Sequence, residues 1–346
     1  MDRMVLGRTG LSVARSGFGA LPIQRASFED ADKILKKAYD NGIDFYDTAR
    51  GYTDSEEKIG RALSGVRKNI VIATKTFARD RETMFEQLET SLKNLKTDYI
   101  DIYQPHNPGS IPEPDGPDGL YGALLEAKRK GMIRFIGITN HRVDLAMKAV
   151  ESGLYDTLQF PFSSLSSDED VKLVEACKKH NVGFIAMKAL SGGLITNAAT
   201  TFAFLRQFEN VLPIWGIQRE SELDEFIAFE KNPPAMDDQM RALIKKDREE
   251  LTGSFCRGCG YCLPCPAGIP INMAARMSFL LARSPYRNLI SEEWRGKMEL
   301  IDGCIECGHC REHCPYGLDT PVLLKRMLGE YREFCEAHKA DIAQAQ

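Results

Sequence analysis

The sequence predicts an α/β protein: a closed (β/α)8 barrel followed by a smaller, mainly helical domain. Between about residues 16 and 230, eight short apolar runs alternate with longer segments whose apolar residues recur at helical spacing. A barrel of eight such units usually needs about 250 residues. The chain has 346 residues and places eight of its ten cysteines between residues 256 and 314, which indicates a second domain with different chemistry.

The predicted strands are short and bounded by charged segments. They occupy residues 16–20, 43–47, 70–75, 99–104, 133–139, 157–160, 183–188 and 212–217. Segments of helical period lie at residues 28–42, 81–96, 119–131, 142–153 and 167–181. Ahead of them, residues 4–14 predict a hairpin that closes the bottom of the barrel. A doubly wound open sheet is the alternative, but the first strand is not followed by a complete G-x-G-x-x-G.

Composition and charge exclude several function classes. The formal net charge is −4 and the pI is about 6.0, so nothing indicates a nucleic-acid backbone or an anionic membrane as a partner. No apolar run reaches the roughly 18 residues of a membrane span, and the amino terminus lacks the apolar core of a signal peptide. We therefore expect a cytoplasmic protein.

Four titratable side chains follow three successive predicted strands. Asp47 ends the second strand with Tyr52 shortly after it, Lys75 ends the third, and His106 follows the fourth. In a parallel barrel these positions meet at the face where chemistry takes place. An ammonium group near a tyrosine lowers the phenol pKa from about 10, which favours proton donation at neutral pH. We expect Asp47 to hold the lysine and His106 to bind a substrate oxygen.

Residues 4 to about 230 resemble the aldo-keto reductases. The motifs GRTGLSV, GIDFYDTARGYTDSEEKIGRAL, IATKT, DYIDIYQPH, GMIRFIGITNH and AMKALSGGL occur in that order. The resemblance implies a (β/α)8 barrel that binds a nicotinamide cofactor across its top and moves hydride to a carbonyl. It implies that Tyr52 is the general acid, that Lys75 and Asp47 tune it, and that His106 orients the carbonyl.

The resemblance also implies cofactor contacts. Thr139, Asn140 and Gln159 match the positions that hold the carboxamide, and Ser191 and Gly192 match the loop that covers the pyrophosphate.

Two places depart from the common family pattern. Met187, before Lys188, stands where relatives often have an aromatic ring that stacks on the nicotinamide. Where many relatives bind an adenosine 2′-phosphate, this chain has Gly216, Gln218, Arg219 and Glu222. A carboxylate at Glu222 repels a phosphate, whereas Arg219 attracts one. NADH and NADPH both remain candidates, with NADH slightly favoured.

The clustered cysteines predict iron-sulfur clusters. Cys304, Cys307, Cys310 and Cys314 form C-x2-C-x2-C-x3-C-P, the run used by bacterial ferredoxins. The expected ligation is crossed between the two sets. One [4Fe-4S] cluster takes Cys256, Cys259, Cys262 and Cys314, and the other takes Cys304, Cys307, Cys310 and Cys265. The first set has only two residues before its last cysteine, which leaves the role of Cys265 as a cross-cluster ligand open.

Zinc bound by four cysteines is the alternative, but triplets followed by Cys-Pro favour clusters. Residues 271–286 and 291–301, between the two cysteine sets, have helical period, so the segment is similar to the helical ferredoxin modules of larger redox enzymes. Cys177 and Cys335 have no partner at ligand spacing and are expected to be structural thiols. The predicted domains are residues 1–250 and 251–346.

Three functions fit the two halves. The first is a carbonyl reductase of the aldo-keto type whose clusters relay electrons to a partner protein or to the substrate. In the second, the clusters are structural or sense redox state. The third is an electron-transfer module without nicotinamide chemistry, against which the presence of Tyr52, Lys75 and His106 argues. A nicotinamide gives up two electrons as hydride, whereas each cluster takes one electron. Direct electron transfer from the cofactor to the clusters is therefore chemically awkward.

Overall fold

The protein forms two compact units. The computed structural model describes residues 1–117, 119–251, 255–283 and 286–344. Unit 1 comprises Met1–Ala189 and Ala199–Met240, and unit 2 comprises Leu190–Ala198 and Arg241–Gln346. The second unit thus includes a short loop from the middle of the sequence. The predicted division at residue 250 stays a prediction.

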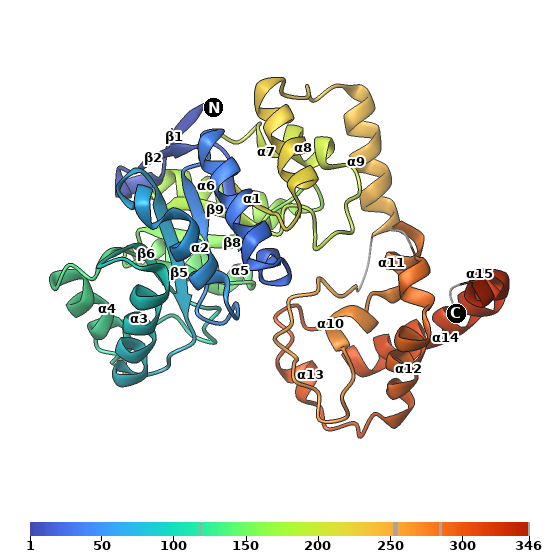
Figure 1. Ribbon diagram of the computed structural model, residues 1–346. Coiled ribbons are helices and arrows are strands. Elements are labelled where there is room, and N and C mark those ends of the chain that lie inside the picture. The colour runs from blue at the N-terminus through green and yellow to red at the C-terminus, as the bar shows by residue number, and fades with distance from the viewer. Residues whose placement is uncertain (118, 252–254, 284–285, 345–346) are drawn as a thin grey trace. The chain divides into compact units, whose positions relative to one another are not determined.

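Unit 1 is a closed barrel of eight parallel strands, as the sequence predicts (Figure 1). The strands are β3 Gly17–Gly19, β4 Phe45–Asp47, β5 Val71–Thr76, β6 Ile100–Pro105, β7 Ile133–Thr139, β8 Thr157–Pro161, β9 Gly183–Met187 and β10 Val211–Gly216. They pair in sequence order, and β10 closes the barrel against β3. Because all strands are parallel, their carboxyl ends meet at one face.

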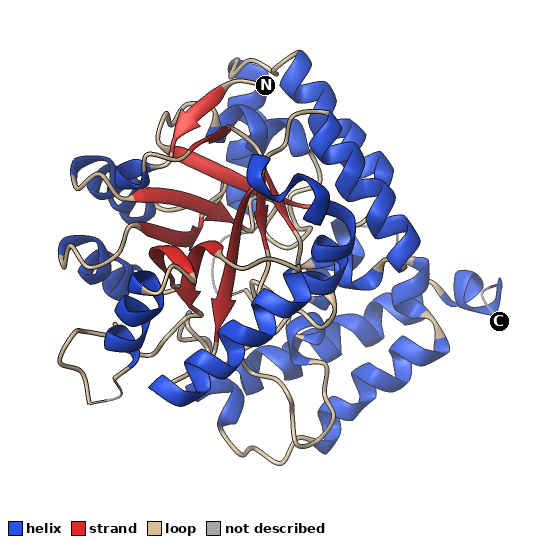
Figure 2. Cartoon of the chain, turned by 60° about the vertical axis from the view of Figure 1, so that its left-hand side comes forward, coloured by secondary structure: helices blue, strands red, loops and turns tan. Residues whose placement is uncertain are grey.

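Helices cover the outside of the barrel (Figure 2). They are α1 Phe28–Asp40, α2 Ser55–Leu63, α3 Arg81–Leu95, α4 Leu120–Arg129, α5 Val143–Glu151, α6 Asp168–Lys179, α7 Ala198–Leu205 and α8 Glu220–Lys231, with 3-10 turns η2 Pro22–Arg25 and η3 Ser64–Asn69. Side-chain caps fix where several begin. Ser27 Oγ accepts from Asp30 N at 3.0 Å before α1, and Ser167 and Asp170 form a capping box before α6.

The predicted hairpin is confirmed. Strands β1 Arg3–Val5 and β2 Ser12–Ala14 pair antiparallel around a 3-10 turn, η1 Gly7–Thr9. Apolar side chains of the hairpin, such as Leu6 and Val13, pack in one buried cluster with Phe45 and Val71, which begin their strands. The hairpin therefore closes the amino-terminal end of the barrel and leaves the opposite face for chemistry.

Unit 2 is helical in its described residues, as predicted. Its helices are α9 Asp238–Glu250, α10 Ile271–Ala274, α11 Met277–Arg283, α12 Glu292–Glu299, α13 His309–Glu312, α14 Thr320–Ala337 and α15 Lys339–Gln344, with turns η4 Arg287–Ile290 and η5 Leu300–Gly303. Residues 284 and 285, in one predicted helical segment, lie outside the described residues. Its core combines aliphatic side chains with three of the clustered cysteines, Cys256, Cys262 and Cys310.

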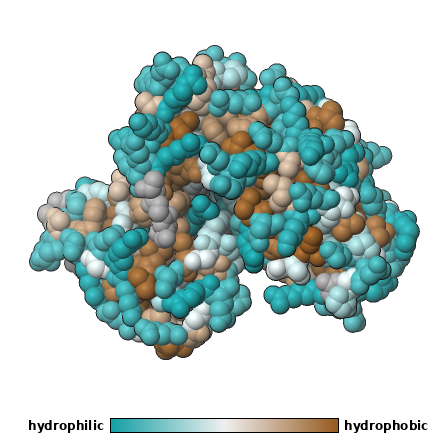
Figure 3. Space-filling view, turned by 180° about the vertical axis from the view of Figure 1, so that it is seen from behind, coloured by the Kyte–Doolittle hydropathy of each residue, from teal (hydrophilic) through white to brown (hydrophobic). Residues whose placement is uncertain are grey.

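One face of the molecule is mainly hydrophilic (Figure 3). Figure 3 shows a face on which hydrophilic side chains predominate and apolar ones are scattered among them. No helix in the described residues is both long and apolar enough to cross a membrane.

Candidate active site and cysteine pockets

The four predicted catalytic residues lie at the carboxyl-terminal face of the barrel. Asp47 ends β4, Lys75 is the second-to-last residue of β5, and His106 follows β6. Lys75 Nζ donates to Asp47 Oδ1 and Oδ2 at 2.7 and 2.8 Å, and to Thr48 O at 2.6 Å. The lysine side chain is fully buried, so this ion pair is shielded from water.

Tyr52 completes the group from the segment between β4 and α2. Lys75 Nζ lies 5.2 Å from the centroid of the Tyr52 ring. The Tyr52 and His106 rings are 5.9 Å apart between centroids and nearly perpendicular. The structure therefore brings together a phenol, an ammonium group and an imidazole around one small region of the barrel face.

Burial and charge set the protonation states of this group. Burial raises the pKa of Asp47, and Lys75 opposes that shift. Burial lowers the pKa of Lys75, and Asp47 opposes it. The pKa of Tyr52 is raised, first by burial and then by the charge of Asp47. The expectation that Lys75 lowers the pKa of Tyr52 is wrong here, because burial, the larger effect, and the charge of Asp47 both raise it. Tyr52 therefore keeps its proton and presents an O–H donor.

His106 is neutral near pH 7 in this environment. Its pKa is lowered well below the ordinary value by burial, and then by the positive charges of Lys75 and Lys188. A neutral imidazole has one N–H to donate, which suits a carbonyl oxygen. The Phe77 ring stacks on His106 with centroids 4.3 Å apart. Sequence reasoning missed Phe77, because an aromatic residue just after a strand has no distinguishing spacing.

Gln159 lies next to the charged pair. Its side chain donates to the carboxylate of Asp47, and its Oε1 accepts from Gln104 Nε2 at 3.0 Å. Both glutamines are buried. Gln104 was also missed, since a glutamine within a strand gives no catalytic signal. The pair extends the polar network from β4 across β6 to β8.

The other two predicted carboxamide contacts are buried at the end of β7. Thr139 Oγ1 accepts from Asn107 N at 2.9 Å. Asn140 Nδ2 donates to Pro108 O at 3.2 Å, and Asn140 Oδ1 accepts from Arg142 N at 2.8 Å. These bonds fix both side chains in the loops at the barrel face.

The residues after β9 are divided between the units. Met187 ends β9 and is buried, and Lys188 follows with a left-handed backbone, φ 57°. Both belong to unit 1, whereas Ser191 and Gly192 belong to unit 2.

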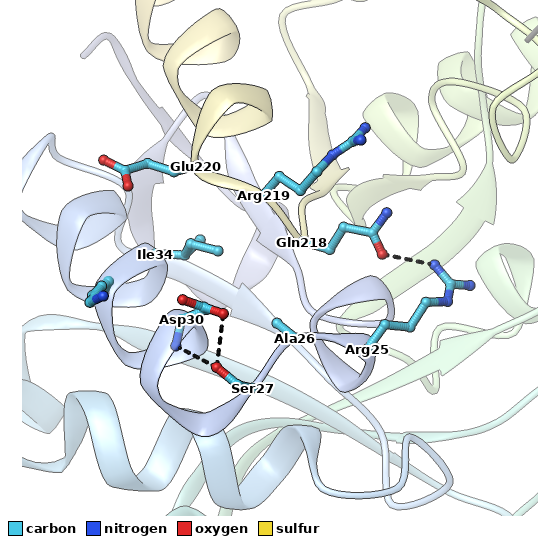
Figure 4. A pocket seen from close by; sticks show the side chains of 9 residues that line it. Arg25, Ala26, Ser27, Asp30, Ile34, Gln218, Arg219 and Glu220 are labelled. Carbon is cyan, nitrogen blue, oxygen red and sulfur yellow. Dashed lines mark hydrogen bonds between the residues drawn. The ribbon is translucent and has the colours of Figure 1, made fainter. Parts of the chain in front are cut away.

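A pocket of about 390 Å³ lies at the start of α8. Figure 4 shows Arg25, Ser27, Gln218 and Arg219 around it, with Gln218 Oε1 accepting from Arg25 Nη1 at 3.2 Å. Lys33 also lines the pocket. Three cationic side chains and two carboxylates, Asp30 and Glu220, thus line a space that includes two of the predicted cofactor residues. The excess of cations suits the phosphorylated end of a nucleotide.

The carboxylate of Glu222 accepts hydrogen bonds from the backbone at the beginning of α8. Its Oε2 accepts from Gln218 N and Arg219 N at 2.9 and 3.1 Å, and its Oε1 accepts from the Arg219 guanidinium at 2.9 and 2.6 Å. The carboxylate is therefore held by the helix terminus and by Arg219. Gly216 ends β10, where a Cβ atom would lie 3.1 Å from the Pro22 ring.

In unit 2 the eight clustered cysteines surround two small pockets. One pocket is lined by Cys256, Cys259, Cys262 and Cys314, and Cys310 also borders it. The other pocket is lined by Cys265, Cys304, Cys307 and Cys310. Each pocket thus includes three cysteines of one set and the last cysteine of the other.

Each cysteine pocket is lined by at least four cysteines, the number that a [4Fe-4S] cluster takes. A single zinc ion needs sulfur atoms about 2.3 Å from it. Within the described parts of the chain, no group of three or more Cys, His, Asp or Glu side chains is arranged to hold one metal ion. Burial raises the pKa of Cys262 to about 12, with Cys256 and Cys259 adding to the shift. Thiolates at these positions need a cationic partner such as iron.

The two remaining cysteines lie outside both pockets. Cys177 is buried in α6, and burial raises its pKa to about 12. Cys335 lies in α14.

Comparison with known proteins matches both units. Residues 15–212 match the model of the Aldo/keto reductase family, and residues 255–319 match that of the 4Fe-4S dicluster domain. L-galactose dehydrogenase of Arabidopsis thaliana is 31% identical over 217 residues, covering 57% of this chain and 67% of that protein. NADH-specific methylglyoxal reductase of Escherichia coli (strain K12) is 29% identical over 231 residues, covering 58% and 71%.

The chain spans about two thirds of the length of curated relatives that it matches. The solved structure of an aldo-keto reductase from Klebsiella pneumoniae in complex with NADPH aligns with a TM-score of 0.62 at 21% identity. That alignment covers 71% of this chain and 95% of the other. At this identity the likeness shows a shared fold.

Proposed function

The chain belongs to the aldo/keto reductase family, and on that premise we propose that it interconverts a carbonyl and an alcohol with a nicotinamide cofactor. We further propose that two [4Fe-4S] clusters relay electrons to a partner protein or to the substrate, and that the protein works in the cytoplasm. The observation that supports the reaction best is the Tyr52 ring beside the buried Lys75–Asp47 pair and His106.

The chain's own residues supply the proton and hold the oxygen. A bound nicotinamide supplies or accepts hydride at the carbonyl carbon. Tyr52 Oη gives its proton to the carbonyl oxygen, so that hydride and proton together make the alcohol. The N–H of the neutral His106 donates to the same oxygen and orients it. Lys75, 5.2 Å from the Tyr52 ring, stabilises the phenolate that remains.

We propose that the predicted residues hold the cofactor in three parts. Thr139, Asn140 and Gln159 contact the carboxamide, with Met187 and Lys188 beside the nicotinamide ring. Ser191 and Gly192 cover the diphosphate. Gly216, Gln218, Arg219 and Glu222 hold the adenosine end, in support of which Gln218 and Arg219 line the pocket at α8.

The preference for NADH or NADPH is tested by a separate experiment. One relative is named as NADH-specific, and one solved neighbour contains NADPH. Arg25 lines the pocket at α8, where its Nη1 donates to Gln218 Oε1. If a 2′-phosphate binds there, Arg25→Gln weakens NADPH binding by about tenfold and leaves NADH binding nearly unchanged. Equal effects on both nucleotides place the 2′-phosphate elsewhere.

Tyr52→Phe tests the reaction. With a panel of carbonyls and alcohols and both nicotinamides under argon, we expect this variant to lose carbonyl reduction while its cluster absorption is unchanged. Tyr121→Phe is the matched control, because it removes a hydroxyl that donates to Leu154 O at 2.7 Å on the outside of the barrel. Full activity in Tyr52→Phe would refute the proposed acid.

The proposed cluster ligands are the two groups that surround the pockets. They are Cys256, Cys259, Cys262 and Cys314 for one cluster and Cys265, Cys304, Cys307 and Cys310 for the other. Bleaching of the brown anaerobic protein by NADH or NADPH, with substrate or partner present, supports electron relay. If the protein does not bleach, the clusters are structural or sense redox state. If the protein is colourless and contains zinc, the cluster proposal is wrong.

A further inference from the structure

Arg276 fills the space between two backbone segments of unit 2. Its side chain is 7% exposed. A Cβ atom at Gly192 would come within 2.6 Å of Arg276 Nη1, and one at Gly258 within 2.9 Å of Arg276 Cζ. Both glycines have positive φ, so their backbones already exclude most other residues. The guanidinium is thus packed directly against the loop after β9 and against the first cysteine segment.

The loop after β9 is firmly held in this unit. Arg283 Nη1 donates to Leu194 O at 2.9 Å, and the same guanidinium pairs with Asp247 at 2.8 Å. Ser191, Gly192 and Gly193 all have left-handed backbones. Gly193 N and Ile195 N both donate to Leu190 O, at 2.9 and 3.3 Å, and close the turn. The loop is therefore a fixed turn packed next to the positive charge of Arg276.

Arg276 also acts on the first cysteine pocket. The guanidinium packs against Gly258, whose Cβ position would lie 2.9 Å from Arg276 Cζ and which is two residues from Cys256. Gly258 N donates to Cys256 Sγ at 3.3 Å. Net charge and hydrogen bonds to sulfur are the main means by which a protein sets a cluster's reduction potential. Arg276 is in position to tune the cluster that Cys256 ligates.

We propose that Arg276 couples cofactor binding to the first cluster, because one guanidinium serves both a diphosphate bound at residues 190–193 and the cluster held by Cys256, Cys259, Cys262 and Cys314. This inference rests on the proposed function, which assigns Ser191 and Gly192 to the cofactor's diphosphate. Arg276 is a positioning residue: it carries no proton or electron in the reaction.

The sign of the coupling follows from charge. Reduction adds an electron to a cluster that is already anionic, and the nearby guanidinium favours it. A bound diphosphate offsets the guanidinium charge and adds its own, so it lowers the reduction potential of this cluster. By linkage, a reduced first cluster binds the dinucleotide more weakly. Electron arrival at the cluster thus promotes release of the cofactor.

The test uses the cluster-loaded full chain under argon with ADP-ribose, which has the diphosphate but no nicotinamide. In the wild type we expect ADP-ribose to lower the potential of one cluster and change its electron paramagnetic resonance signal, while the other cluster is unaffected. In Arg276→Gln we expect a lower potential without ligand, no response to ADP-ribose, and about tenfold weaker binding. Arg276→Lys should restore part of the response.

Two further variants exclude a general structural effect. Arg257→Gln is the matched control, because Arg257 belongs to the same cysteine segment but lies over the Tyr316 ring, 4.4 Å from its centroid. It should keep the response to ADP-ribose. Gly192→Ala keeps Arg276 but inserts a Cβ atom beside its guanidinium, and it should weaken the response.

The outcomes separate this inference from the proposed function. If ADP-ribose and NADPH bind the wild type but neither cluster responds, the coupling is wrong and the reductase proposal stands. If no nicotinamide nucleotide binds, both proposals fail. An equal response in wild type and Arg276→Gln means that the signal reaches the cluster by another route, which also overturns the role of Arg276.

Discussion

The barrel site and the cysteine pockets are organised in different ways. In the barrel, Lys75 already pairs with Asp47, and Gln104 Nε2 donates to Gln159 Oε1, so the charged pair and the amides are held by other groups of the chain. In unit 2, buried thiols such as Cys262 line the pockets, and their raised pKa values disfavour the thiolate form without a cation. We infer that the chain alone organises the barrel site, whereas the second unit depends on iron and sulfide for its order.

Removing the clusters gives the largest expected effect and tests this contrast directly. The chain has two tryptophans, Trp215 in β10 of unit 1 and Trp294 in α12 of unit 2. After chelation of iron we expect Trp294 emission to become that of an unfolded chain, because three cysteines belong to the core of this unit. In a Trp294→Phe background, the denaturation midpoint reported by Trp215 should stay the same. A native Trp294 signal in the iron-free protein would show that unit 2 folds without its clusters.

Lys75→Met should produce the next largest effect, on unit 1 alone. It leaves the Asp47 carboxylate buried without its partner, which typically costs about 3–5 kcal/mol. Denaturation followed by Trp215 in the Trp294→Phe background measures this loss. The double variant Lys75→Met/Asp47→Leu should recover part of the stability, because the unpaired charge is gone, but no carbonyl reduction. The same stability in single and double variants would show that the pair does not hold the site together.

The sequence predicted most of the fold, because its signals were local. Eight apolar runs, the hairpin at residues 4–14 and the helical period between the cysteine sets all became the expected elements. The inclusion of residues 190–198 in unit 2 has no local signal. It depends on contacts such as Arg283 with Leu194, between residues far apart in sequence.

The site was predictable in composition but not in its electrostatics. Strand ends gave Asp47, Lys75 and His106 their neighbouring positions. The direction of the Tyr52 pKa shift depends on the 2.7 Å approach of Asp47 to Lys75 and on burial, neither of which spacing reveals. Arg276 carried no motif at all, and its role emerges only when Gly192 and Gly258 are seen on either side of it.

The stability of unit 1 should depend on pH through His106, and this effect should be smaller than that of Lys75→Met. Its folded-state pKa lies below the ordinary value of about 6.5, so below that pH the unfolded chain binds the extra proton. Stability is therefore full above about pH 6.5 and falls as pH drops toward the folded pKa, by at most about 1.4 kcal/mol per pH unit. His106→Gln should flatten the decline measured through Trp215. His180→Gln, which removes a half-buried histidine at the end of α6, should not.

Helix caps give the smallest effect and sharpen the contrast between the units. Ser167→Ala removes the capping box of α6 and should cost unit 1 about 1 kcal/mol, with or without iron. Ser291 Oγ accepts from Trp294 N at 3.4 Å before α12, and Ser291→Ala should cost unit 2 a similar amount or less. Because a cap matters only where its helix is folded, the Ser291 effect should vanish in the iron-free protein while the Ser167 effect persists. An equal Ser291 effect in both states would mean that α12 keeps its fold without the clusters.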